Sequence, residues 1–147
     1  MHFWDTSALL KLYVPEADSA TFLAFVGGSR DVIVASELAQ AELYRALWFK
    51  EFSGALRRGG AASLFAKARS DMVSGKIVLL PFGREVQDEF RAVADACFRL
   101  KPAVPIRTMD GLHLATARVA RARLVVCADT QFRKAALALG MPVFPPP

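Results

Sequence analysis

Short apolar runs alternate with longer amphipathic stretches along this chain. The runs are HFW (2–4), DVIVAS (31–36), KIVLLPF (76–82), RLVVCAD (123–129) and MPVF (141–144). Continuous, partly β-branched runs of this length are typical of strands that are covered on both faces. The pattern therefore predicts five buried strands.

The stretches between these runs show helical spacing. We expect helices after Pro15 as far as the two glycines at 27–28, and over 37–50, 59–75, 83–100, 109–122 and 131–140. Ser36, Thr108 and Thr130 are expected to cap the second, fifth and sixth of these helices, and Gly140 is expected to end the last. Strands and helices thus alternate along most of the chain.

Such alternation predicts a three-layer α/β/α fold, with a central, mostly parallel sheet flanked by helices. The 147 residues fit a single domain over 1–147, in which 142–147 form a frayed, Pro-rich tail. No apolar run approaches the length of a membrane span, and no signal peptide is evident. Cys97 and Cys127 lie in apolar contexts, as expected of reduced core residues in a cytoplasmic protein.

Composition adds two expectations. Hydrophobic residues make up 54% of the chain, somewhat above the usual ~45–50%. This excess is consistent with a further buried surface such as a subunit interface, and equally with an ordinary core. The net charge of +5 favours a polyanionic partner such as nucleic acid, although solubility alone would also explain it.

Four carboxylates are expected at one edge of the sheet, outside the carboxyl ends of the strands, where ligands bind in this architecture. Asp5 and Asp129 directly follow two predicted strands, Asp110 falls in the first turn of a helix, and Glu42 lies on another helix. Each has an alternative role. Asp5 and Asp129 suit helix caps, Asp110 suits the helix dipole, and Arg45 is a candidate partner for Glu42.

The combination favours a metal site. Two carboxylates ~4 Å apart repel each other by about 4 kcal/mol at an effective dielectric constant near 20. Four of them together call for a cation or for protonation. Hard divalent cations take oxygen ligands, and Mg²⁺ bound in this way promotes phosphodiester chemistry. A basic protein with an acidic metal pocket is a reasonable nuclease.

Several motifs resemble those of the PIN-domain nucleases, in order along essentially the whole chain. They are DTSALLKLYVPE (5–16), Glu42 within ASELAQAELYRAL (35–47), RTMDGLHLATA (107–117) and CADTQFRKAALALG (127–140). The first and third are the more specific. Within that family, the chain is most similar to the VapC-type toxin ribonucleases of bacterial toxin–antitoxin pairs.

The resemblance implies a function and a site. Asp5, Glu42, Asp110 and Asp129 match the family's four metal-site acids, which are also the expected catalytic residues, and Thr6 and Ser7 match the hydroxyl residues that support them. The family implies an endoribonuclease that depends on Mg²⁺ or Mn²⁺ and cleaves structured RNA of the tRNA or rRNA class. It also implies a homodimer and a cognate VapB-type antitoxin that occludes the site.

Other readings stay open at this point. Arg45, Arg107, Arg133 and Lys134 lie near the acidic motifs as candidate RNA contacts, and each also suits an ordinary ion pair or a solvated charge. His113 has either a supporting or a packing role. Two alternatives to the nuclease are an inactive PIN-like module that binds RNA or protein, and a metal phosphatase of small substrates.

Overall fold

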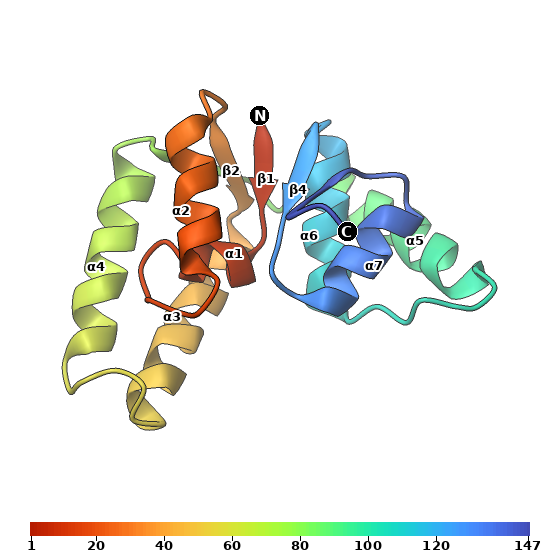
Figure 1. Ribbon diagram of the computed structural model, residues 1–147. Helices are drawn as coiled ribbons and strands as arrows, with labels where there is room; N and C mark the ends of the chain where they lie inside the picture. Colours follow the sequence, from red (N-terminus) through yellow and green to blue (C-terminus); the bar gives the residue numbers. More distant parts are fainter.

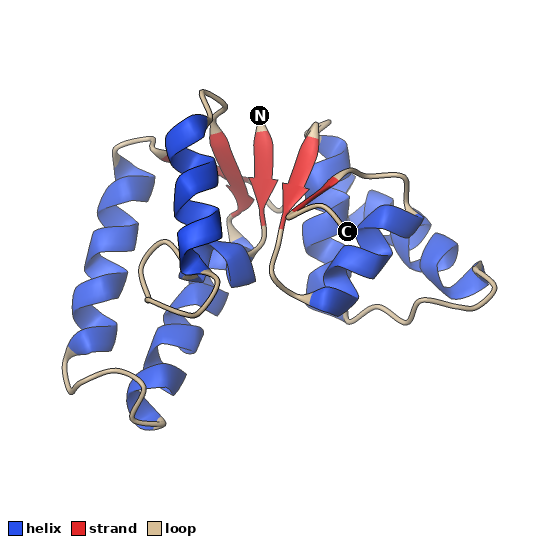
Figure 2. Cartoon of the chain, in the orientation of Figure 1, coloured by secondary structure: helices blue, strands red, loops and turns tan.

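The computed structural model describes all residues from Met1 to Pro147, and a sheet of five parallel strands forms its centre. Helices lie on both sides of the strands (Figures 1 and 2). The strands are β1 (His2–Trp4), β2 (Ile33–Ser36), β3 (Ile77–Leu80), β4 (Leu124–Val126) and β5 (Val143–Phe144). Their order in the sheet is β3-β2-β1-β4-β5, and every neighbouring pair is parallel. All five predicted strands are confirmed.

Seven helices cover the two faces of this sheet. They are α1 (Thr6–Leu10), α2 (Ser19–Gly28), α3 (Leu38–Phe52), α4 (Gly60–Val73), α5 (Arg84–Arg99), α6 (Thr108–Val119) and α7 (Thr130–Ala138). Helices α1 to α4 share one hydrophobic core with the sheet, and α5 to α7 share the other. Figure 1 shows the two groups on opposite sides of the strands. The expected three-layer α/β/α fold is confirmed.

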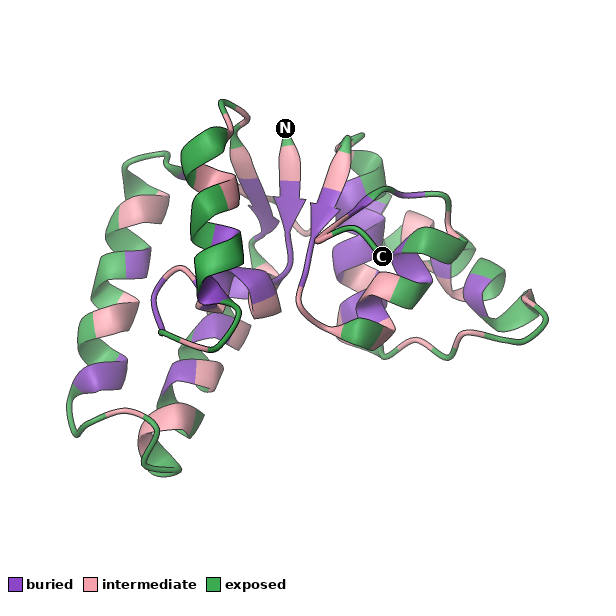
Figure 3. Ribbon diagram, in the orientation of Figure 1, coloured by how far each residue is buried: buried purple, intermediate pink, exposed green.

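Adjacent strand residues supply the two cores in turn. Phe3 on β1 packs toward α5–α7, whereas its neighbour Trp4 packs toward α1–α4. Val125 and Val126 on β4 divide in the same way. Successive side chains of a strand point to opposite faces, so a strand that is buried on both faces needs an uninterrupted apolar run. Figure 3 shows the resulting concentration of buried residues at the sheet.

The strand order creates a switch point beside β1. This strand pairs with β2 on one side and with β4 on the other. The connections therefore run in opposite directions from β1, and the loops that follow β1 and β4 separate at the carboxyl edge of the sheet. Ligands bind at such switch points in open α/β sheets. Asp5 and Asp129 follow these two strands.

One helix approaches another closely at a glycine. A Cβ atom on Gly111 in α6 would lie 2.6 Å from Cε2 of Phe90 on α5. The missing side chain therefore lets the two helices pack tightly, directly beside Asp110.

The three predicted caps are each wrong by one residue. Thr108 and Thr130 are the first helical residues of α6 and α7, while Arg107 and Asp129 occupy the cap positions. Asp129 makes the better cap because its carboxylate accepts a hydrogen bond from Phe132 N at 2.8 Å. Ser36 is the last residue of β2, and Glu37 occupies the cap position of α3, although the Oγ of Ser36 still accepts a hydrogen bond from Leu38 N at 3.3 Å.

The expected frayed tail is wrong for Val143 and Phe144. These residues form the edge strand β5, in which Val143 pairs with Val125 and Phe144 with Val126. Phe144 also stacks on Phe25 of α2, with ring centroids 4.0 Å apart. An edge strand tolerates the neighbouring prolines, because one side of it needs no hydrogen-bond donors.

The two cysteines are buried and unpaired, as expected. None of the seven helices combines the length and the apolar character that crossing a membrane requires.

Candidate active site

Asp5 directly follows the central strand β1, and Asp129 lies three residues after the neighbouring strand β4. Asp5 N still donates to the carbonyl of Val126 at 2.9 Å, so the pairing of β1 with β4 extends to this residue. Each carboxylate also caps a helix, since Asp5 accepts from Ser7 N at 3.0 Å and Asp129 accepts from Phe132 N. The helix-cap roles considered from the sequence are therefore real. The same capping hydrogen bonds also hold the carboxylates of Asp5 and Asp129 in position.

Ser7 ties these two loops together. Its Oγ donates to Oδ2 of Asp5 at 2.6 Å and accepts from the backbone N–H groups of Ala128 (3.0 Å) and Asp129 (3.3 Å). One hydroxyl thus orients the Asp5 carboxylate and holds the loop that carries Asp129. Supporting residues of this kind limit the motion of the groups that react.

Glu42 reaches the same edge from α3 and is held by two partners. Thr6 Oγ1 donates to Glu42 Oε2 at 2.6 Å, and Nε2 of His113 on α6 lies 2.5 Å from the same oxygen. Arg45, the partner suggested by the sequence, instead lies over the ring of Phe49, 5.2 Å from its centroid. His113 thereby receives a supporting role: it is buried and connects α6 to α3.

Burial and charge act against each other at these groups. Burial would raise the pKa of Glu42, but hydrogen bonds from His113 and Thr6 outweigh it and lower the pKa. Burial would lower the pKa of His113, but the hydrogen bond to Glu42 and the charges of Asp5, Glu42 and Asp110 raise it. Both shifts favour an ionised pair. Burial raises the pKa of Asp5, although His113 and Ser7 oppose it.

Asp110 and Asp129 share one arginine. Arg107 Nε donates to Asp110 Oδ2 at 2.7 Å, while its NH2 group lies 3.3 Å from Asp110 Oδ1 and 3.1 Å from Asp129 Oδ2. The Asp110 side chain is only 11% exposed and that of Asp129 is 33% exposed, whereas that of Arg107 is 68% exposed. A largely exposed cation therefore bridges two carboxylates at the site.

These groups line one small cavity of about 200 Å³. Its walls comprise all four predicted acids, both predicted hydroxyl residues and two of the predicted cations, namely Asp5, Thr6, Ser7, Glu42, Arg45, Arg107, Asp110 and Asp129, together with Ala46. The sequence did not indicate Ala46, whose only signal is its position one turn after Glu42. Arg133 and Lys134 lie outside this cavity, and Arg133 donates to the carbonyl of Pro146 at 3.3 Å.

The chemical type of the donor atoms suits a hard divalent cation. Carboxylate oxygens are its preferred ligands, four carboxylates line the cavity, and a guanidinium cation already lies between two of them. No three His, Cys, Asp or Glu side chains are gathered closely enough to hold a metal ion as they stand. Instead, His113 and Arg107 supply the positive charge next to Glu42, Asp110 and Asp129.

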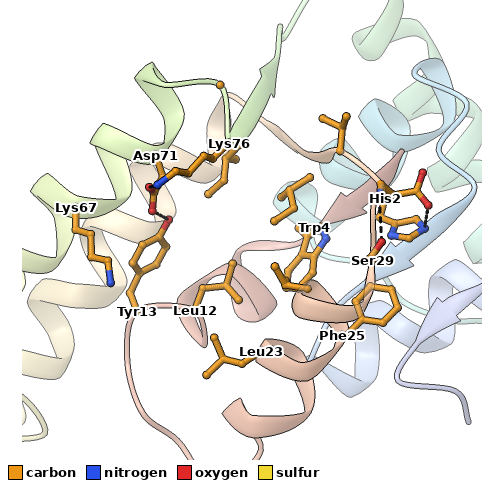
Figure 4. A pocket seen from close by; sticks show the side chains of 16 residues that line it. His2, Trp4, Leu12, Tyr13, Leu23, Phe25, Ser29, Lys67, Asp71 and Lys76 are labelled. Atoms are coloured by element: carbon orange, nitrogen blue, oxygen red, sulfur yellow. Dashed lines mark hydrogen bonds and ion pairs between the residues drawn. The ribbon is translucent and has the colours of Figure 1, made fainter.

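A larger cavity of about 450 Å³ lies on the α1–α4 side of the sheet (Figure 4). Tyr13 and Lys76 both bond Asp71 on one wall, at 3.1 and 3.0 Å, and His2 and Trp4 lie on the other. This cavity contains none of the four acids and is mostly apolar. The smaller cavity is therefore the one equipped for polar chemistry.

Comparisons with known proteins agree with this architecture. The PIN domain family model matches residues 3–137. No curated protein matches the sequence. Among solved structures, FitAB bound to an IR36 DNA fragment has a TM-score of 0.75 at 19% identity, with 98% of this chain and 94% of that chain covered.

Two further solved structures are similar. VapC20 of Mycobacterium tuberculosis, described as a toxin that cleaves the sarcin–ricin loop, has a TM-score of 0.67 at 16% identity, covering 92% of this chain and 95% of that one. A toxin–antitoxin complex from Klebsiella pneumoniae has a TM-score of 0.59 at 14% identity, covering 88% of each chain. At these identities the likeness concerns the fold. The family model, which spans nearly the whole chain, shows that this protein belongs to the PIN-domain family.

Proposed function

We propose that this protein is a metal-dependent endoribonuclease that acts as the toxin of a toxin–antitoxin pair. One observation carries the proposal: in a chain of the PIN family, four carboxylates from four separate segments line a single cavity at the switch point of the sheet. A protein that only binds RNA gains nothing from concentrating negative charge there, since the phosphates of its ligand are negative too.

The proposed ligands of Mg²⁺ or Mn²⁺ are Asp5, Glu42, Asp110 and Asp129. When bound, the ion supplies an activated water nucleophile and stabilises the charge that develops on the phosphate. Ser7 holds the Asp5 carboxylate in place, and Thr6 and His113 hold that of Glu42. These contacts keep the acids oriented, and ordered ligands need less rearrangement when a cation binds.

The surroundings suit a phosphodiester substrate. Arg45 and Arg107 line the same cavity as the acids and are the proposed contacts to RNA phosphates. The net charge of +5 supports attraction to a polyanion. We propose structured RNA of the tRNA or rRNA class as the target, in the cytoplasm where these RNAs are found.

Similar structures support the toxin role and an antitoxin partner. One similar protein is described as a toxin that cleaves the sarcin–ricin loop, and another was solved as a toxin–antitoxin complex. We propose a VapB-type antitoxin as the inhibitor of this chain, and a homodimer as its oligomeric state.

The function is tested by mapping new RNA 5′ ends across a bacterial transcriptome after brief induction. We expect a few sharp new ends with the wild-type protein and none with Asp110→Asn, which removes one ligand charge from the cavity. Asp88→Asn is the matched control, because Asp88 lies on α5 with its side chain 61% exposed. It is expected to give the wild-type pattern.

The opposite result has a clear meaning. If all three proteins are folded and give identical end maps, the nuclease proposal is wrong. The alternative of an inactive RNA- or protein-binding module would then be favoured, and the pairing of the acids with Arg107 and His113 would serve to neutralise the cavity.

A further inference from the structure

Arg107 has an unusual position for a residue that is expected to contact RNA. Its guanidinium takes both oxygens of Asp110 and one oxygen of Asp129, although 68% of the side chain is open to solvent. Hydrogen bonds and charge attraction to Asp110 and Asp129, rather than burial, therefore hold Arg107 in place.

The same oxygens belong to the proposed metal ligands. A divalent cation bound by Asp110 and Asp129 needs lone pairs that the guanidinium now occupies, and the two positive charges would repel each other at this range. Arg107 and a metal ion are thus alternative partners of one carboxylate pair. His113 does not compete with a metal ion in this way, because its ring is buried and contacts only one oxygen of Glu42.

We infer that Arg107 is an exchangeable counter-ion, which holds Asp110 and Asp129 until a metal ion displaces it and then binds an RNA phosphate at the mouth of the cavity. This inference rests on the proposed function. It assigns Arg107 a positioning role that depends on the metal, in place of a permanent RNA contact.

The chemistry of arginine suits both positions. Its planar fork of N–H donors matches carboxylate and phosphate groups equally well, and its exposed stem leaves room to move. Because metal and guanidinium compete, each metal ion that binds releases one phosphate-binding group. Metal and phosphate therefore strengthen each other's binding, by the same factor in both directions.

The first test measures Mn²⁺ binding alone, from the loss of the free Mn²⁺ signal in electron paramagnetic resonance. Arg107→Ala is expected to bind Mn²⁺ about tenfold more tightly than the wild type, because the competitor is gone. Arg45→Ala is the matched control: Arg45 lines the same cavity but lies over Phe49 rather than on an acid. Its Mn²⁺ affinity is expected to change by less than about twofold.

The second test uses adenosine 5′-monophosphate, a phosphate monoester that an endonuclease cannot cut. Without metal, Arg107→Ala and wild type are expected to bind it equally, because Arg107 is held by the acids. With saturating Mn²⁺, the variant is expected to bind it several-fold, up to about tenfold, more weakly. Far-UV circular dichroism checks that each variant is folded.

The outcomes separate the two proposals. Equal Mn²⁺ affinity in wild type and Arg107→Ala, or equal tightening in Arg45→Ala, overturns the exchange while the nuclease proposal stands. Weaker nucleotide binding by Arg107→Ala that is the same with and without Mn²⁺ also overturns it, since Arg107 would then be a permanent contact. If no variant binds Mn²⁺ at all, both proposals fail.

Discussion

At the scale of single residues, the site depends on side chains that touch the acids and not only on the acids themselves. Ser7 contacts Asp5 and the backbone of the β4–α7 loop, and Thr6 and His113 contact Glu42. Each of these bonds restricts a carboxylate that would otherwise be free to rotate. Residues in this position typically affect activity or metal affinity by about 10- to 100-fold.

Ser7→Ala tests this dependence. The change leaves Asp5 without its 2.6 Å bond and leaves two backbone N–H groups without their acceptor. We expect a loss of about 1–3 kcal/mol in the free energy of unfolding, measured by urea denaturation, and a 10- to 100-fold loss of RNA cleavage. Ser63→Ala, on the exposed face of α4, is the control and should alter neither quantity. Unchanged cleavage in Ser7→Ala would refute the proposed role.

At the scale of elements, ion pairs reinforce a contact that the hydrophobic core also makes, between the N-terminal segment and α3. Glu16, in the turn between α1 and α2, accepts from Lys11 Nζ at 2.6 Å and from Lys50 near the end of α3. The hydrogen bonds from Lys11 and Lys50 lower the pKa of Glu16 from its ordinary 4.5. This residue therefore fastens the N-terminal turn to the long helix that carries Glu42.

The lowered pKa predicts how this contribution depends on pH. Because the folded carboxyl has the lower pKa, its stabilisation is complete above the unfolded value and is lost as pH falls through the folded value. Glu16→Gln should therefore lower the free energy of unfolding by up to about 1 kcal/mol at pH 7. This difference in stability between variant and wild type should shrink below pH 4.5. Thermal unfolding of both proteins at pH 7, 5, 4 and 3 measures this difference in stability.

Glu85→Gln serves as the control for this series, because Glu85 is exposed in the first turn of α5. A constant difference between wild type and Glu16→Gln at every pH would mean that the ion pairs contribute nothing that depends on charge.

At the scale of the whole molecule, α3 presents an apolar surface that the chain itself does not cover. Tyr44, Trp48, Phe49 and Phe52 are 47%, 44%, 55% and 87% exposed, and they lie at helical spacing along one helix. The apolar excess in the composition is thus partly a surface property. Exposed aromatic patches of this kind mark interaction sites.

The proposed homodimer makes this surface the first place to test. We expect light scattering at micromolar concentration to give twice the chain mass of 16.0 kDa for wild type, and the mass of one chain for Phe52→Asp, because a buried charge opposes association. Leu137→Asp, a comparable change on the exposed side of α7, should stay dimeric. A wild-type monomer would remove the homodimer from the proposed function.

Much of this protein follows from local sequence pattern. The five strands were predicted because burial on two faces requires continuous apolar runs, and Asp5 and Asp129 were placed at strand ends by direct succession. Six of the seven helices were predicted from their spacing, whereas the short helix α1 was not among the expected helices. The errors in the predicted caps at Thr108 and Thr130 also have a local cause. They arose because a neighbouring residue competes for the same position, and at Asp129 the carboxylate is the stronger acceptor.

Only the tertiary structure decided which groups meet. His113 and Glu42 lie 71 residues apart, and Arg107 and Asp129 lie 22 apart, so no helical or strand period links either pair. Their contacts depend on the strand order β3-β2-β1-β4-β5, and on α3 and α6 bringing Glu42 and His113 together from opposite faces of the sheet. The sequence by itself determined that four acids stand at one edge. The packing of distant elements determined that the acids are partnered by Thr6, His113 and Arg107.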